Sequence, residues 1–81
     1  MNVRVLYFAV TRELAGIGEE SFELETGATI ASARAAIEAR HPALRATDAR
    51  LRVAKNESFA LDAEAIAHGD VIALIPPVAG G

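Results

Sequence analysis

Two stretches of sequence decide how this chain folds: Val3-Arg4-Val5-Leu6-Tyr7-Phe8-Ala9 and Val71-Ile72-Ala73-Leu74-Ile75. Both are rich in β-branched or other large apolar residues, so each predicts a β-strand. Successive side chains of a strand point to opposite faces of its sheet, and both stretches carry apolar residues on both faces. We therefore expect them to be central strands, which need cover on both sides.

The only long helix is predicted between these strands. Thr29 can cap it, and Pro42 stops it near His41. Its buried stripe follows helical spacing and comprises Ile30, Ala33, Ile37 and Leu44. Five shorter elements are expected around it: a helical turn over residues 11–16, an edge strand over 20–25, a third strand over 50–54, a fourth over 58–61 and one helical turn over 63–67.

The order of these elements predicts an α+β fold of the β-grasp, ubiquitin-like type. About five strands form a mixed sheet, and one main helix packs on one of its faces. We expect residues 1–76 to form this domain and residues 77–81 to form a flexible tail. No linker or internal repeat divides the chain of 81 residues.

A single long helix covers only one face of a sheet whose central strands are apolar on both. The other face should therefore expose an apolar patch, and such patches mark protein–protein contacts. Strand alternation places Phe8 on the same face as Leu6, and Ile75 on the same face as Ala73. We expect Phe8 and Ile75, with Phe59 from the neighbouring strand, to form this patch, and Val78 to continue it onto the tail. Loops folded over this face, or self-association, would also cover it.

The tail combines two prolines with two terminal glycines. Pro76 and Pro77 end the last strand and keep the chain extended, while Gly80 and Gly81 leave its end thin. Six residues reach at most about 20 Å, enough to enter another protein's active site. The chain has no cysteine, so we expect the Gly81 carboxylate to be its only chemically competent group.

Composition and spacing argue against several other functions. The net charge of −3 disfavours nucleic acid and anionic membranes as partners. No stretch has the length and apolarity of a membrane span or a leader segment, so we expect a cytoplasmic protein. His41 and His68 follow no metal or triad spacing, and Glu19-Glu20 is expected to be a solvated turn. We expect no bound cofactor, no metal and no active site of the chain's own.

Five motifs stand together along nearly the whole chain: Val5-Leu6-Tyr7-Phe8-Ala9, Arg12-Glu13-Leu14-Ala15-Gly16, Asn56-Glu57, Gly69-Asp70-Val71 and Ile75-Pro76-Pro77-Val78-Ala79-Gly80-Gly81. They resemble the small sulfur-carrier subunit of molybdopterin synthase. Lys55 departs from that family, which commonly has an apolar residue there, and this puts any family contact at that position in doubt.

The resemblance implies a carrier cycle. A partner of the ubiquitin-activating type would use ATP to adenylate the Gly81 carboxylate, and a sulfur donor would convert it to a thiocarboxylate. The tail would then deliver sulfur to cyclic pyranopterin monophosphate inside the large synthase subunit. Gly80 has no side chain and would therefore fit the narrow channel that leads to the partner's active site. The residues that would contact the partner are Phe8, Phe59, Ile75, Pro76, Pro77 and Val78.

Several points stay open at the level of sequence. A sulfur carrier for thiamine or cysteine biosynthesis, a ubiquitin-like protein modifier and a plain interaction domain would share much of this pattern. The sequence names neither the activating enzyme nor the sulfur donor, and it does not fix the stoichiometry, a heterotetramer of two large and two small subunits being the expectation. The roles of Arg12, Glu13 and Lys55 are also open.

Overall fold

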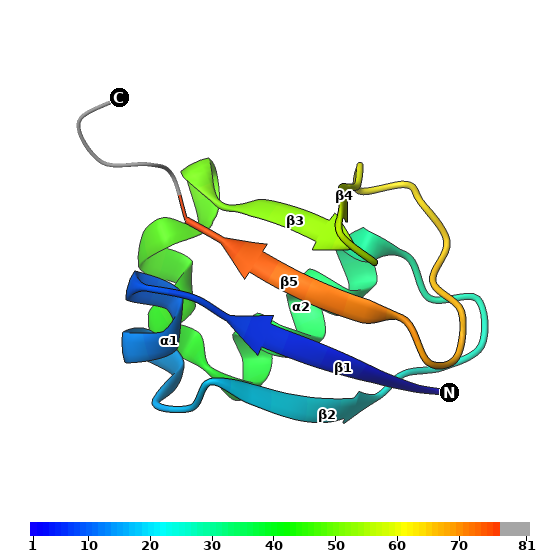
Figure 1. Cartoon of the computed structure of the whole chain (residues 1–81), viewed down its shortest axis with the longest axis horizontal. Coiled ribbons are helices and arrows are strands. Elements are labelled where there is room, and N and C mark those ends of the chain that lie inside the picture. The colour runs from blue at the N-terminus through cyan, green and yellow to red at the C-terminus, as the bar shows by residue number, and fades with distance from the viewer. Residues whose placement is uncertain (77–81) are drawn as a thin grey trace.

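A computed structural model describes residues 1–76, with residues 48–50 described by their backbone alone. Its elements run in the order β1 (Asn2–Tyr7), α1 (Val10–Ala15), β2 (Glu19–Glu23), α2 (Ile30–Arg40), the 3-10 helix η1 (Pro42–Arg50), β3 (Arg52–Lys55), β4 (Ser58–Phe59) and β5 (Val71–Ile75). Figure 1 shows them arranged as one sheet with helices behind it.

The sheet has the strand order β2-β1-β5-β3-β4. The two strands predicted to be central, β1 and β5, lie side by side and are parallel, with Tyr7 paired to Leu74. The remaining pairs are antiparallel, which makes the sheet mixed. β2 is an edge strand, as its polar–apolar alternation predicts. The β-grasp fold class expected from the element order is confirmed.

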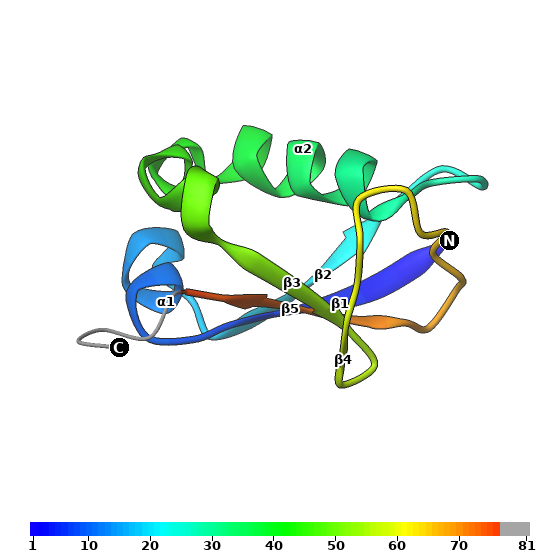
Figure 2. The same cartoon turned by 90° about the horizontal axis from the view of Figure 1, so that it is seen from above.

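Helix α2 lies across one face of the sheet, as Figure 2 shows from above. Thr29 begins it with a capping box, in which the Thr29 hydroxyl accepts from the Ser32 N–H and the Ser32 hydroxyl accepts from the Thr29 N–H. The predicted stripe is buried, although Leu44 belongs to η1 instead of α2. These residues close a core that contains Val3, Val5, Tyr7, Phe22, Leu24, Ile30, Ala33, Ile37, Leu44, Leu51, Val53, Ile66, Ile72 and Leu74.

The helical turn predicted over residues 63–67 is wrong. This segment instead runs beside the start of α2, where Thr29 and Ala65 form an isolated bridge. The carbonyls of Asp62 and Glu64 accept the N–H groups of Ala31 and Ile30. These carbonyls serve the unpaired amides of the first turn of α2, so they are not available for a helix of their own.

The second difference from the sequence-based expectation is η1. Pro42 does end α2, but the chain continues as a 3-10 helix up to Arg50. Leu44 is fully buried in it, and the Leu44 N–H donates to the His41 carbonyl. Leu44 therefore anchors η1 to the core, and hydrophobic periodicity does not reveal an anchor of this kind in a nine-residue, mostly polar segment.

Truncation of Leu74 tests the position of this core. We expect Leu74→Ala to lower the free energy of unfolding by about 2 to 5 kcal/mol, because Leu74 lies in the packed layer between β5 and α2 and a cavity would remain. Denaturant unfolding followed by circular dichroism measures this. Leu61→Ala is the matched control, since Leu61 is 78% exposed. Equal losses in the two variants would contradict the assignment of the core.

Candidate functional site

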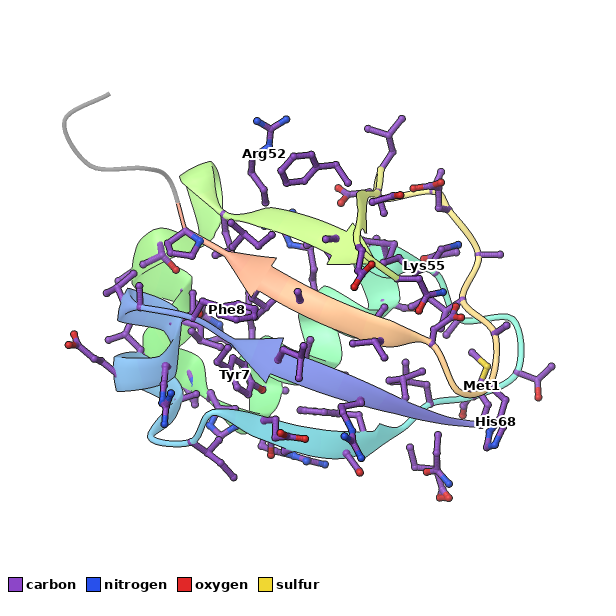
Figure 3. The ribbon with its side chains drawn as sticks, in the orientation of Figure 1. Met1, Tyr7, Phe8, Arg52, Lys55 and His68 are labelled. Carbon is purple, nitrogen blue, oxygen red and sulfur yellow. The ribbon has the colours of Figure 1, made fainter. Side chains whose placement is uncertain are left out.

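The sheet face away from α2, hereafter the open face, contains an apolar hollow. Its volume is about 310 Å³, and it is lined by Leu6, Phe8, Ala54, Glu57, Phe59, Val71, Ala73 and Ile75. Seven of these eight residues are apolar, and they come from β1, β5 and the β3–β4 hairpin together with Phe8 just beyond β1. The open face is turned toward the viewer in Figure 3, where Phe8 lies near the ends of β1 and β5.

Phe8 is held on this face by its backbone. Thr11 is fully buried, and its hydroxyl accepts the Phe8 N–H at 2.8 Å. The same hydroxyl lies 2.8 Å from the Phe8 carbonyl and 3.2 Å from the Leu74 carbonyl, where it can donate. Ala9 then takes a positive φ of 50° to start α1. These bonds fix Phe8 to the end of β5, and the Phe8 side chain is left 47% exposed.

Three of the residues predicted to bind a partner surround this one hollow: Phe8, Phe59 and Ile75. Phe59 is the most exposed of the hollow's aromatic residues, at 62%. Ile75 ends β5, and Pro76 follows it directly with an intermediate exposure. Pro77, Val78, Gly80 and Gly81 lie outside the described residues. The roles of all of these residues in binding or chemistry stay predictions.

The β3–β4 hairpin that carries Phe59 turns on Asn56 and Glu57. Lys55 pairs with Ser58, so the loop has two residues, and both have positive φ, 50° at Asn56 and 73° at Glu57. This is the pattern of the primed turn that matches strand twist, in which Asn is favoured at the first position and Gly at the second. Glu57 therefore occupies a position better suited to glycine.

Asn56 also joins two of the motifs that stand apart in the sequence. Its side-chain amide donates to Asp70 at 2.9 Å, and its side-chain oxygen accepts the Val71 N–H at 2.9 Å. The Ala67 N–H donates to Asp70 as well, at 2.8 Å. This backbone bond and then the Asn56 bond hold the pKa of Asp70 below its ordinary value. Asn56 and Asp70 thus fix the hairpin to the start of β5, which is a structural role.

Sequence reasoning missed two charged residues at the hollow, Arg52 and Glu57. The Arg52 guanidinium lies 4.5 Å from the centre of the Phe59 ring, and Glu57 lines the hollow itself. Figure 3 shows Arg52 beside the end of the sheet at which β5 stops. Because neighbouring residues of a strand point to opposite faces and Val53 is buried on the helix side, the sequence could have placed Arg52 on the open face. It could not show that the Arg52 guanidinium contacts the Phe59 ring.

The structure gives Arg12 and Lys55 local roles. The Arg12 guanidinium packs against Gly18, where an added Cβ would meet it at 3.4 Å. Arg12 and Glu13, two described residues that are neighbours in the sequence, form no ion pair with each other. The Lys55 ammonium donates to the Ala65 carbonyl at 2.9 Å and so ties β3 to the segment before β5. Lys55 pairs with the buried Ile72, on the helix side of the sheet and away from the hollow.

The prediction that Glu19-Glu20 is a solvated turn is wrong. Both residues are in β2, and the Glu20 side chain is only 14% exposed. Its carboxylate accepts hydrogen bonds from the Tyr7 hydroxyl at 2.6 Å, from Arg40 at 3.1 Å and from His41 Nε2. The His41 ring also packs edge-on against Tyr7, with centroids 5.6 Å apart. These donors come from β1 and the end of α2, which the sequence separates from Glu20.

This polar cluster (Tyr7, Glu20, Arg40 and His41) changes the acidity of two of its members. Burial by itself would raise the pKa of Glu20, but the hydrogen bonds from Tyr7, His41 and Arg40 outweigh it and hold that pKa below its ordinary value. Burial, followed by the hydrogen bond to the Glu20 carboxylate, raises the pKa of Tyr7 far above its ordinary value. Glu20 is therefore ionised at neutral pH, and Tyr7 is a permanent donor to it.

Among the described side chains, which leave out those of residues 48–50, no three His, Asp or Glu residues lie close enough together to hold a metal ion. No helix within residues 1–76 has the length and apolarity needed to cross a membrane.

Comparison with known proteins agrees with the β-grasp class. The model of the ThiS family matches residues 5–81, and the chain belongs to that family. The molybdopterin synthase sulfur carrier subunit of Chlamydomonas reinhardtii is 43% identical, with the alignment covering 100% of both chains.

Two solved structures show the same fold. SAMP1 from Haloferax volcanii is 32% identical and has a TM-score of 0.90, covering 100% of both chains. A putative molybdopterin converting factor, subunit 1, from Pyrococcus furiosus is 34% identical with a TM-score of 0.88, covering 96% of this chain and 99% of that one. The family resemblance expected from the five motifs is confirmed.

The lowered pKa of Glu20 predicts how stability depends on pH. A carboxylate whose folded-state pKa is depressed contributes stability that is present above its unfolded pKa, about 4.3, and is lost as the pH falls through the folded value. We expect Glu20→Gln to lower the free energy of unfolding by about 1 to 3 kcal/mol at pH 7. Urea unfolding from pH 7 to pH 3 should show this difference shrinking below about pH 4.5.

Glu23→Gln is the matched control for this experiment, because Glu23 is on the same strand and exposed. Its effect on stability should be small at every pH. A Glu20→Gln variant whose loss is the same at pH 3 and pH 7 would contradict the role of the ionised carboxylate.

Proposed function

We propose that this chain is the sulfur carrier of molybdopterin synthase and that it carries sulfur on the Gly81 carboxylate. The observation that best supports this is the position of the hollow. Ile75 lines it and is also the last residue of β5, so a partner docked on Phe8 and Phe59 receives the chain that continues toward Gly80 and Gly81. The full-length likeness to the Chlamydomonas reinhardtii subunit supports the same function.

The proposed cycle has three chemical steps. First, an oxygen of the Gly81 carboxylate attacks the α-phosphorus of ATP, forming an acyl adenylate and releasing pyrophosphate. A sulfur donor then attacks the acyl carbon, and AMP leaves. Adenylation is needed for this step because the oxygen of a free carboxylate is a poor leaving group. With sulfide as the donor, this attack gives the thiocarboxylate directly. In the third step the thiocarboxylate sulfur attacks a carbon of cyclic pyranopterin monophosphate and displaces an oxygen from it, and water then hydrolyses the resulting thioester, which leaves the sulfur on the pterin and restores the Gly81 carboxylate.

In this proposal the chain supplies the sulfur and its partners supply the catalysis. An adenylating enzyme of the ubiquitin-activating type binds ATP, and the large synthase subunit provides the acid–base groups and the pterin pocket. The chain itself binds no cofactor and acts in the cytoplasm. Docking through Phe8, Phe59, Ile75 and Pro76 positions the residues beyond them, where glycine keeps the acyl carbon accessible.

A protein modifier is the second candidate, and one observation favours it. SAMP1 from Haloferax volcanii is 32% identical over its full length, and two of the similar structures are named small archaeal modifier protein 1. A modifier would join Gly81 to a lysine of another protein by an isopeptide bond. Incubation with ATP and a lysate of the source cells distinguishes the two, since a modifier gives conjugates of higher mass and a carrier gives a thiocarboxylate.

Intact mass spectrometry tests the carrier chemistry. After incubation with ATP, the cognate activating enzyme and sulfide, we expect the mass to rise by one exchange of sulfur for oxygen, about 16 Da. Deletion of Gly81 should abolish the gain while leaving the thermal unfolding midpoint unchanged. The carboxylate has no such role if the deletion variant gains the same mass.

Replacement of Phe8 tests the docking face. Because an aromatic anchor at an interface centre contributes about 2 kcal/mol or more, Phe8→Ala should weaken binding to the large subunit at least tenfold, measured by calorimetry. Its cost to folding should be small, since Phe8 is 47% exposed. Val10→Ala is the control, an exposed apolar residue of α1 that does not line the hollow. A large loss of stability with unchanged affinity would show that the faces are assigned the wrong way round.

A further inference from the structure

Arg52 begins β3, beside the residue at which β5 ends. It pairs with Ile75 in the β3–β5 register, and its guanidinium lies over the Phe59 ring. Among the side chains described, those of residues 1–47 and 51–76, no carboxylate forms an ion pair with it. Arg52 is exposed in the free domain, and its contact with Phe59 does not occupy the N–H donors, because a ring face attracts the cation without accepting each N–H.

A partner that covers Phe59 and Ile75 also removes water from Arg52. A guanidinium is always charged, and a charge that is buried without a partner costs far more than the packing around it contributes. The domain offers no carboxylate to Arg52 within its described residues. The partner must therefore present one, and a bidentate carboxylate matches the guanidinium fork.

Glu57 supplies the opposite charge on the same surface. Of the described residues that line the hollow, Glu57 is the only polar one, and it is exposed. Its φ of 73° is unfavourable for a residue with a side chain, and the second position of this turn favours glycine. A non-glycine residue held in that conformation at a candidate binding surface suggests that its side chain is needed there. Within the described side chains of residues 1–47 and 51–76, no hydrogen bond or ion pair uses the Glu57 carboxylate.

We propose that Arg52 and Glu57 determine which partner docks on the open face and in which orientation. The partner is the large subunit of the proposed function, on which this inference rests. It presents a carboxylate to Arg52, a Lys or Arg side chain to Glu57, and apolar side chains to the hollow between them. An apolar hollow alone accepts many surfaces and rotations, whereas two opposite charges at fixed positions reject partners whose charges are reversed.

Charge removal at Arg52 is the first test. Binding of the purified large subunit from the same organism is measured by surface plasmon resonance at low and high salt. Arg52→Met keeps the aliphatic cover over Phe59 without the charge, and we expect it to weaken binding about three- to tenfold at low salt, and less at high salt. Arg4→Met is the matched control, an arginine of β1 on the same face whose charge is already paired with Glu19 at 3.2 Å.

Glu57 allows a test in which stability and binding move in opposite directions. Glu57→Gly should raise the thermal unfolding midpoint by about 3 °C, because the left-handed position no longer carries a side chain. The same variant should bind the large subunit about three- to tenfold more weakly. Glu57→Gln keeps the backbone strain and removes the charge, so it should lose affinity without gaining stability.

The outcomes separate this inference from the proposed function. If wild type binds and Phe8→Ala does not, while the Arg52 and Glu57 variants bind as wild type at low salt, the charge assignment is wrong and the proposed function stands. A loss at Arg52→Met that is equal at low and high salt also overturns it, since packing alone would explain that loss. Failure of wild type to bind the large subunit overturns both.

Discussion

The parallel pairing of β1 with β5 is the constraint on which the rest of the structure depends. Two parallel neighbours cannot be joined by a tight turn, so the chain between them must cross over the sheet, and it does so through α2 and η1, which connect β2 at one edge to β3 on the other side of β5. The crossover covers only one face of the sheet. Because β1 and β5 are apolar on both faces, the uncovered face exposes apolar side chains. The pairing also brings Phe8, beyond the end of β1, next to Ile75 at the end of β5.

A few polar side chains hold this arrangement at places where strands stop. Thr11 binds the backbone of Phe8 and lies within donor distance of the Leu74 carbonyl, which fixes the ends of β1 and β5 together. Asn56 does the same between the β3–β4 hairpin and the start of β5. Both residues form hydrogen bonds between segments that are far apart in the chain. These bonds limit how the walls of the hollow can move relative to one another.

The two faces of the sheet serve different purposes. The covered face supplies the stability of the domain, with fully buried residues such as Val5 and Ile72. The open face keeps Phe8 and Phe59 exposed, which costs stability in the free domain and is understandable if a partner covers them. An entirely apolar open face would favour self-association, and the charges of Arg52 and Glu57 disfavour it.

The sequence by itself determined the elements whose signals are local. Composition identified β1 and β5, Thr29 and Pro42 bounded α2, and the presence of one long helix implied an open apolar face with Phe8, Phe59 and Ile75 on it. The tertiary structure alone decided what depends on distant partners: η1 held by Leu44, residues 63–67 bonded to the start of α2, Glu20 bound by Tyr7 and His41, and Arg52 lying on Phe59. A spacing pattern reports which face a side chain occupies, but a hydrogen bond or a ring contact across the sheet requires the register that only folding fixes.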